Sequence, residues 1–501
     1  MKSRITSRMF VLAVIVSMAG TVRLAEAQHE QHQPAAPTKD TSSSTTTQPV
    51  SDTVSSRSVE PTKATDPLKT NKSTEHSTHS STLKHAAETQ PGESMSMAGA
   101  IGALIPGVAS EREGSGTSWL PDQSATHARH WQRDPWMLML HGVAVLRYTN
   151  QDASDAGPRG DDALSAPNWA MLMAMRPVGH SGQITLRAML SLDRLTEGGD
   201  GYPLLFQTGE SWESQPLVDQ QHPHDFLMEL AAAYGRKVGE HGGYFVYFGL
   251  PGEPALGPPA FMHRPSARNN LEAPLGHHWQ DATHITFGVL TSGYVHKSMK
   301  LDASVFTGRE PDEDRWGIDE PKFDSYSGRI SYNPSPRFSL QFSGGRLKSP
   351  EMLEPDIDLT RVTASSLCHH AIGHGYMWNS AIIWGMNDPS VGEAQHSLLI
   401  ESDWEGRVLS PYGRLEIVQK PGHDLQISGA DEELFNVGAV TLGVAIAVPI
   451  MKAWKSSASI QGTAYRVPDG LQGEYGKRPW SVSVQFQLSP SQTTGHADGT
   501  H

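Results

Sequence analysis

The chain has 501 residues, with 54 acidic and 40 basic side chains, and its formal net charge at pH 7 is −14. This acidic balance argues against a nucleic acid as partner, because such binding needs a basic surface. Cys368 is the only cysteine, so no disulfide can form within the chain.

The first 27 residues have the pattern of a secretory signal peptide. Lys2, Arg4 and Arg8 precede an apolar stretch from Met9 to Ala19, and the sequence AEA before Gln28 fits a cleavage site. Eleven apolar residues are too few to span a bilayer as a helix. This segment carries four basic residues and one acidic residue, so we expect an exported mature chain with a formal charge of −17.

The segment 28–113 is rich in Ser, Thr, His and Pro, which predicts a disordered extension because such a composition cannot bury a core. We interpret 114–135 as a linker or plug segment and 489–501 as a polar tail. Between them, residues 136–488 show a different sequence pattern.

Period-2 alternation recurs throughout residues 136–488. In the stretch WSVSVQFQL, for example, every second residue is apolar and the intervening ones are Ser or Gln, as in a strand with two different faces. We count about sixteen such segments: 136–148, 168–176, 182–192, 226–237, 243–250, 284–295, 298–307, 324–333, 337–346, 358–367, 376–384, 396–404, 410–418, 435–448, 456–467 and 480–488. An even number of this size predicts an all-β fold, a transmembrane antiparallel β-barrel.

The predicted connections alternate in length, which supports the barrel. Long ones such as 193–225, 251–283 and 385–395 are separated by short ones such as PVGHS and NPSPR. Outer-membrane barrels have short periplasmic turns and long external loops. We therefore expect a protein of the outer membrane of a Gram-negative bacterium, with the lipid bilayer and the barrel assembly machinery as partners.

The two faces of the predicted strands differ in character. In the fourth segment we expect one face to carry Leu227, Glu229, Ala231 and Ala233, and the other to carry Phe226, Met228, Leu230, Ala232 and Tyr234. Charged side chains alternate with aliphatic ones in several other segments, which suits a wet lumen and a lipid-facing exterior. The candidate lumen-lining residues, expected to set the field inside a channel, are Arg187, Lys300, Asp302, Arg329, Glu401, Asp403, Arg414 and Glu416.

Five motifs in the long connections carry a resemblance. QHPHDFLMELAAAY, GEPALGPPAFMHR, GHHWQDATHITFG, SVFTGREPDEDRW and RLKSPEMLEPD, in this order, resemble an uncharacterised family of bacterial outer-membrane β-barrel proteins, over roughly residues 114–488. The resemblance implies the barrel and supplies no activity that could be transferred.

Histidines and an aspartate in two long connections form a candidate metal site. The expected ligands for copper or zinc are His222, His224, Asp225, His263, His278 and His284. His277 is left out, because neighbouring side chains on a strand point in opposite directions. The alternative is that these side chains hold the loops together as a plug or line a vestibule, in which case no cofactor is bound.

The sequence therefore favours a porin-like channel for small solutes or ions, with long external loops constricting its lumen. The first alternative is an envelope metal-binding protein that uses the loop histidines. The second is an outer-membrane hydrolase, although the sequence contains neither HExxH nor GxSxG, so we expect no enzymatic activity.

Overall fold

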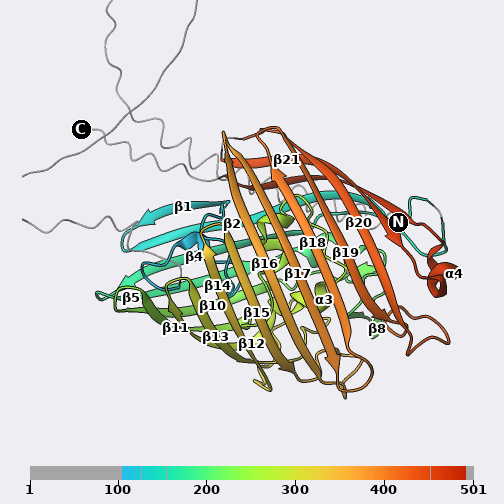
Figure 1. Cartoon of the computed structure of the whole chain (residues 1–501), viewed down its shortest axis with the longest axis horizontal. Coiled ribbons are helices and arrows are strands. Elements are labelled where there is room, and N and C mark those ends of the chain that lie inside the picture. Colours follow the sequence, from blue (N-terminus) through green and yellow to red (C-terminus); the bar gives the residue numbers. More distant parts are fainter. Residues whose placement is uncertain (1–103, 126, 155, 452, 492–501) are drawn as a thin grey trace, which may run out of the picture. The chain divides into compact units, whose positions relative to one another are not determined.

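Sixteen antiparallel strands close into one barrel in the computed structural model of the protein (Figure 1). The structure describes residues 104–491 except 126, 155 and 452, so the predicted signal peptide, most of the predicted extension and most of the polar tail lie outside the described residues. The barrel strands are β2 (Trp136–Asn150), β4 (Asn168–Val178), β5 (Gly182–Leu190), β10 (Leu227–Val238), β11 (Gly242–Gly252), β12 (Thr286–His296), β13 (Met299–Phe306), β14 (Ser325–Ser335), β15 (Phe338–Leu347), β16 (Leu359–Gly373), β17 (Tyr376–Pro389), β18 (Gln395–Glu405), β19 (Leu409–Pro421), β20 (Leu434–Ala447), β21 (Trp454–Arg466) and β22 (Trp480–Pro490).

Each barrel strand overlaps one of the sixteen predicted segments, so the predicted fold class is confirmed. The period-2 pattern succeeds because a strand sends alternate side chains to opposite faces, and here those faces meet different surroundings. The remaining elements are short: β1 (Ala128–Arg133), β3 (Asp162–Ser165), β6 (Tyr202–Pro203), β7 (Ser211–Trp212), β8 (Gln215–Pro216), β9 (Gln220–Gln221), α2 (Asp193–Thr196), α3 (His277–Gln280), α4 (Gln472–Tyr475), η2 (Ser110–Arg112), η3 (Phe261–His263), η4 (Pro265–Ala267), η5 (Ala282–His284) and η6 (Asp469–Leu471).

The barrel closes between its first and last strands. β22 pairs antiparallel with the second half of β2, from Ala144 opposite Leu488 to Asn150 opposite Val482. The first half of β2 pairs with β4 on one side and with β1 on the other. This pairing of β22 with β2 satisfies the backbone groups at the seam, which a sheet in lipid requires because the bilayer core offers no water to exposed backbone groups.

The connections place nearly all the long loops at one rim of the barrel. Turns such as 297–298 define a short-turn rim, and connections such as 191–226 and 253–285 begin and end at the opposite, long-loop rim. One predicted long loop, 385–395, shrinks to 390–394 because β17 continues to Pro389. No helix among the described residues is long and apolar enough to cross a bilayer.

The outward face of the strands is apolar. Leu442 is 70% exposed, and Leu301, Phe342 and Ile460 are also exposed on outward positions. Aromatic side chains gather near the strand ends at the short-turn rim, including Tyr234, the opposed pair Tyr244 and Tyr294, and Tyr332, Phe338, Trp378 and Trp404. An apolar band with an aromatic girdle is the surface that a transmembrane barrel presents to lipid.

Two segments fill much of the barrel interior. The N-terminal plug, residues 104–124, lies against the inner wall: the hydroxyl of Thr117 donates to Asp302, and Asn333 donates to the carbonyl of Leu120. The loop plug, residues 253–285, joins β11 to β12 and is almost entirely buried. The two plugs touch, since the backbone N–H of Ala260 donates to the hydroxyl of Ser115 at 2.8 Å.

Two expectations about these regions are wrong in detail. The predicted disordered extension ran to residue 113, but the chain is structured from Leu104, which is buried together with Ile105. Met228, expected on the outer face, is fully buried, because the pairing of β10 with β5 shifts register between Leu227 and Glu229. A bulge of this kind inserts one residue and reverses the alternation beyond it.

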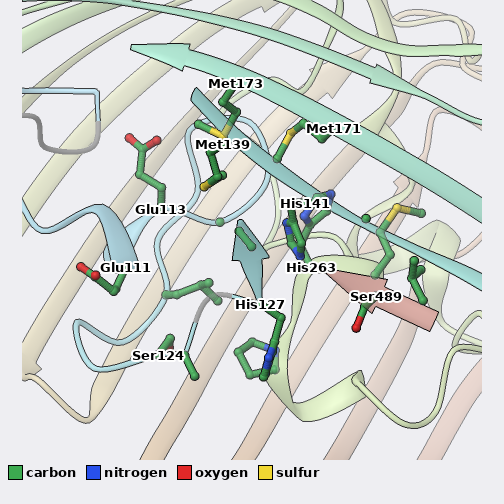
Figure 2. A pocket seen from close by; sticks show the side chains of 18 of the residues that line it. Glu111, Glu113, Ser124, His127, Met139, His141, Met171, Met173, His263 and Ser489 are labelled. Carbon is green, nitrogen blue, oxygen red and sulfur yellow. The ribbon is translucent and has the colours of Figure 1, made fainter. Parts of the chain in front are cut away.

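The plugs leave one large chamber in the barrel. This cavity of about 470 Å³ lies between parts of both plugs and strands β1, β2 and β4 (Figure 2). Its wall includes Met137, near the start of β2, and Ser489, near the end of β22, so the chamber lies toward the short-turn rim.

Candidate metal site

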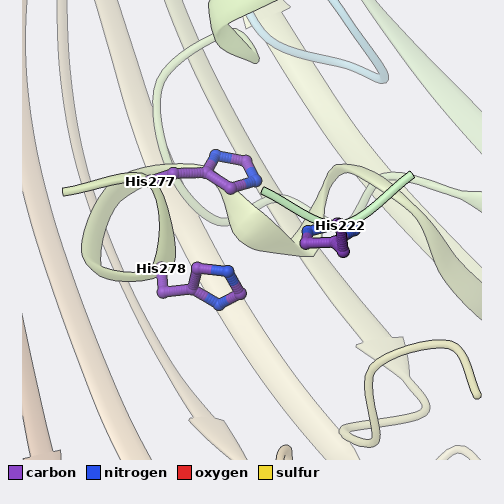
Figure 3. Close-up of side chains that lie close together, drawn as sticks. All are labelled: His222, His277 and His278. Carbon is purple, nitrogen blue, oxygen red and sulfur yellow. The ribbon is translucent and has the colours of Figure 1, made fainter. Parts of the chain in front are cut away.

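Three buried histidines converge near the long-loop rim. His222 precedes β10, while His277 and His278 begin the helical turn α3 inside the loop plug. One nitrogen from each ring lies within 4.8 Å of the others, and Figure 3 shows the rings of His277 and His278 extending toward His222. Zinc holds its nitrogen ligands at about 2.0–2.1 Å, so binding would draw these rings together by about 1 Å.

The convergence of His277 with His278 corrects the sequence interpretation. His277 was left out because its segment was taken to be extended, but residues 277–280 form a helical turn in which neighbouring side chains do not point in opposite directions. The spacing HHxxD carried a usable signal, because residues four apart meet on one side of a helix. Asp281 is in this position, and its Oδ1 lies 2.6 Å from Nδ1 of His277.

Asp281 holds His277 in place and is itself anchored. Its second oxygen, Oδ2, accepts a hydrogen bond from Arg264 at 2.6 Å, and the same guanidinium donates to Glu401 on β18 at 2.8 Å. A carboxylate on one imidazole nitrogen orients the ring and leaves Nε2 available to a metal ion. The wall of the barrel therefore fixes one of the three candidate ligands.

Two carboxylates stand beside the other rings. Glu210 Oε1 lies 3.1 Å from Nε2 of His222, and Glu310 Oε1 lies 3.7 Å from Nδ1 of His278. Arg315 forms an ion pair with Glu210. Three imidazoles with a nearby carboxylate make up a donor set that can complete tetrahedral coordination.

Burial favours the neutral form of His222, His277 and His284. It lowers the pKa of His222 well below its usual value, and the charge of Arg315 acts in the same direction. Burial also lowers the pKa of His277 against the opposing effect of Asp281, and it lowers the pKa of His284 to about 3. The neutral ring is the form that binds a metal ion.

The other predicted ligands surround this group at varying distances. His284 packs against His277 with ring centroids 5.2 Å apart, and His224 lies 5.6 Å from His284. His224 is held by Asp193, 2.7 Å away. Asp225 is buried and pairs with Arg315 at 3.5 Å, so it is not directed at the three converging rings.

His263 belongs to a different place. It lies in η3, where its ring is 4.7 Å from that of Trp169 and 5.7 Å from that of His141. Both His263 and His141 line the large chamber. The six residues proposed from the sequence are therefore divided between two parts of the lumen.

The eight candidate lumen-lining charges all point inward, and each is at most 6% exposed. They do not face open water, because each bonds to a plug residue. The contacts are Arg187 to Gly116, Lys300, Asp302 and Arg329 to Thr117, Glu401 to Arg264, Asp403 to Asn269, Arg414 to Asn270 and Glu272, and Glu416 to Leu275. These charges anchor the plugs, and the sequence interpretation that they set the field inside a channel stays a prediction.

The molecule is thus a transmembrane barrel with a filled lumen and a buried histidine cluster. No protein-family model and no curated protein matches this sequence. Solved structures similar to the chain include OmpF of Salmonella typhi in complex with daunomycin, with 9% identity, a TM-score of 0.45, and coverage of 72% of this chain and 99% of that one. An anion-selective porin from Comamonas acidovorans has 11% identity and a TM-score of 0.44, with coverage of 71% and 99%. OprB of Pseudomonas putida has 8% identity and a TM-score of 0.44, with coverage of 71% and 94%.

Proposed function

We propose that this porin-like barrel lies in the outer membrane of a Gram-negative bacterium and binds a divalent transition-metal ion at its long-loop end. The observation that carries the proposal is the convergence of His222, His277 and His278, three buried imidazoles whose nitrogens lie within 4.8 Å. Imidazole suits zinc, copper and nickel, whereas calcium and magnesium prefer oxygen ligands.

The arrangement around the rings favours an ion over a purely structural cluster. Three imidazoles packed together offer one another few hydrogen bonds, and a buried polar atom without a partner costs stability. Nδ1 of His278 has no hydrogen-bond partner among the described residues and has only the longer ion-pair contact with Glu310. A bound ion would give this nitrogen a partner.

The second part of the proposal concerns passage through the barrel. We infer that small solutes or ions pass through only a narrowed lumen, because the N-terminal plug and the loop plug occupy the interior and bond to the wall. A barrel of this strand number without such plugs would be wide enough to conduct freely. The expected single-channel conductance is accordingly low.

Metal binding can be tested on the full-length barrel in detergent. After removal of bound metal with a chelator, equilibrium dialysis against zinc and, separately, copper(II) should show a bound ion that is lost in the double variant His222→Ala, His278→Ala. The matched control, His180→Ala with His296→Ala, changes two exposed histidines near the short-turn rim and should keep the ion.

The histidines of the N-terminal extension are the same in all three proteins, so the difference between them reports on the buried site alone. An affinity at least a hundredfold weaker in the site variant supports the proposal. Heat-modifiable gel mobility checks that both variants are folded. If they are, equal ion content in the site variant and the control overturns the proposal of metal binding.

A further inference from the structure

The large chamber at the short-turn end has an unusual lining. Six of the 18 methionines of the chain line it, against three branched aliphatic residues, Leu120, Val143 and Leu271. Figure 2 shows Met139, Met171 and Met173 gathered on one side of the chamber, with His141 and His263 beside one another. Thioethers and imidazoles thus face the same space.

The register of the sheet explains this gathering. On the inward face of β2 and β4, Met137 lies directly opposite Met175, Met139 opposite Met173, and His141 opposite Met171. Residues directly opposite in an antiparallel pair have Cβ atoms roughly 5 Å apart. A thioether reaches far enough beyond its Cβ for two opposed sulfurs to contact one ion. We call these five methionines the methionine ladder: Met137, Met139, Met171, Met173 and Met175.

Packing alone does not account for the ladder. Methionine is a flexible filler of irregular gaps, yet here the side chains surround a cavity of about 470 Å³ that they do not fill. Leucine would match their volume and specify the wall better. Methionine, unlike leucine, has a polarisable sulfur. The same chamber is also lined by the imidazoles of His127, His141 and His263.

The charges around the chamber favour a cation of low charge. Its three arginines are paired with carboxylates: Arg187 with Glu113, which also lines the chamber, Arg264 with Asp281 and Glu401, and Arg268 with Glu405. The carboxylates that line the chamber are Glu113, which pairs with Arg187, and the exposed Glu111. The thioether ligands themselves carry no negative charge, so they suit a monovalent ion better than a divalent one, whose charge would need carboxylates to offset it.

We infer that the methionine ladder, with His141 and His263, forms a second metal site that binds a soft monovalent cation, copper(I) or silver(I). Thioether sulfur selects copper(I) over the harder divalent ions. The inference does not rest on the proposed histidine site at the long-loop end, because it uses different residues and a different ligand class.

The two sites are nevertheless aligned along the lumen. His284 packs against His277 of the first site, and His263 stands at the chamber. A small void lies between them, lined by His263, His284, Met171 and Met189. Histidine and methionine side chains therefore continue from one site toward the other.

Silver(I) is the probe of choice, because it has the ligand preference of copper(I) and needs no reductant. The full-length barrel in detergent, in a chloride-free buffer, would be titrated with silver nitrate, and retained silver measured after desalting. We expect the triple variant Met139→Leu, Met171→Leu, Met173→Leu to bind silver at least tenfold more weakly than the unchanged protein. X-ray absorption of the silver-loaded protein should show sulfur neighbours that the variant lacks.

Methionine and leucine have similar volumes, so the variant should fold. Heat-modifiable gel mobility checks this. The control Met299→Leu with Met352→Leu changes two exposed methionines and should keep both silver affinity and the sulfur signal. The double variant His222→Ala, His278→Ala should also retain silver, whatever happens to its zinc.

Unchanged silver affinity in the ladder variant overturns the inference, as does equal loss in the control. Absence of sulfur neighbours in the silver-loaded protein, which can be measured without any variant, overturns it as well. Failure of the zinc experiment alone leaves the silver result unaffected.

Discussion

Arg329 and Asp302 face each other across β14 and β13, and their side chains form a fully buried ion pair at 3.0 Å. Thr117 of the N-terminal plug joins this pair, since its hydroxyl donates to Asp302 at 2.7 Å and accepts from Arg329 at 2.7 Å. Arg329 also donates to the carbonyl of Gly257 at 3.0 Å. One guanidinium thus holds both plugs against the wall.

Replacing this arginine should loosen the plugs. We expect Arg329→Met to lower the free energy of unfolding by about 3 kcal/mol, because removing one partner of a buried pair leaves the other uncompensated. Lys300 lies 3.2 Å from Asp302 and still compensates its charge. The expected loss of stability is therefore near the low end of the range for breaking a buried ion pair. Planar-bilayer recordings should show higher single-channel conductance than in the unchanged protein. Arg236→Met, on an exposed residue of β10, is the control, and equal conductance in the two variants would contradict the anchoring role.

Asp281 should act on the metal site through His277. We expect Asp281→Asn to weaken zinc binding by roughly 10- to 100-fold, because loss of the carboxylate that orients a ligating imidazole has effects of this size. Arg264 keeps its contact with Glu401, so the barrel should remain folded. The matched control is Asp193→Asn, which removes the same kind of contact from His224 outside the three converging rings. A similar loss of zinc affinity in both variants would show that the effect is not specific to His277.

Glu253 should make the stability of the barrel depend on pH. Burial at the start of the loop plug raises the pKa of this carboxyl to about 8, although the nearby charge of Arg329 opposes the rise. The folded state therefore holds the proton more tightly than the unfolded chain does. The stability that the neutral acid supports is complete below pH 4.5 and is lost as the pH rises toward 8.

Glu253→Gln should remove this loss. Each pKa unit corresponds to about 1.4 kcal/mol, so the variant should gain on the order of a few kcal/mol over the unchanged protein at pH 9, with little difference at pH 4. Urea unfolding followed by tryptophan fluorescence at several pH values measures the difference. A constant offset between the two proteins across this range would count against a neutral Glu253.

The cost of a charged substitution on the lipid-facing surface should depend on its depth in the membrane. Leu442 lies near the middle of β20 and is 70% exposed, so we expect Leu442→Arg to destabilise the barrel in lipid by about 2–4 kcal/mol. Val408 is 66% exposed but lies in the turn between β18 and β19, so Val408→Arg should cost about 1 kcal/mol or less. Unfolding from vesicles compares the two, and equal costs would argue against the assigned membrane band.

The barrel could be predicted from the sequence because its signal is local. Alternation along β22 appears in the sequence as every second residue, and the two environments that sort those residues extend along the whole strand. The predicted side of Met228 was wrong for the same reason, because a local pattern does not show how two strands pair. A bulge inserts one residue into one strand of a pair, so it becomes visible only when the partner strand β5 is placed beside β10.

The histidine site and the methionine ladder could be predicted from the sequence only in part. His222 and His278 were found because histidine is conspicuous in a loop, but His277 required knowledge that α3 is helical. The methionine ladder required the register of β2 against β4, since Met139 and Met173 are far apart in the chain and meet only across the sheet. The plug contacts depend in the same way on long-range placement.

The position of the N-terminal plug in the chain has a consequence for the order of assembly. Residues 104–124 precede β2, and the ring of strands closes only when β22 reaches β2. The wall charges that bond to this segment lie on strands between those two. Final strand pairing therefore encloses this segment together with its partners, and a barrel that closed without it would leave Asp302 and Arg329 buried without Thr117, their shared third partner.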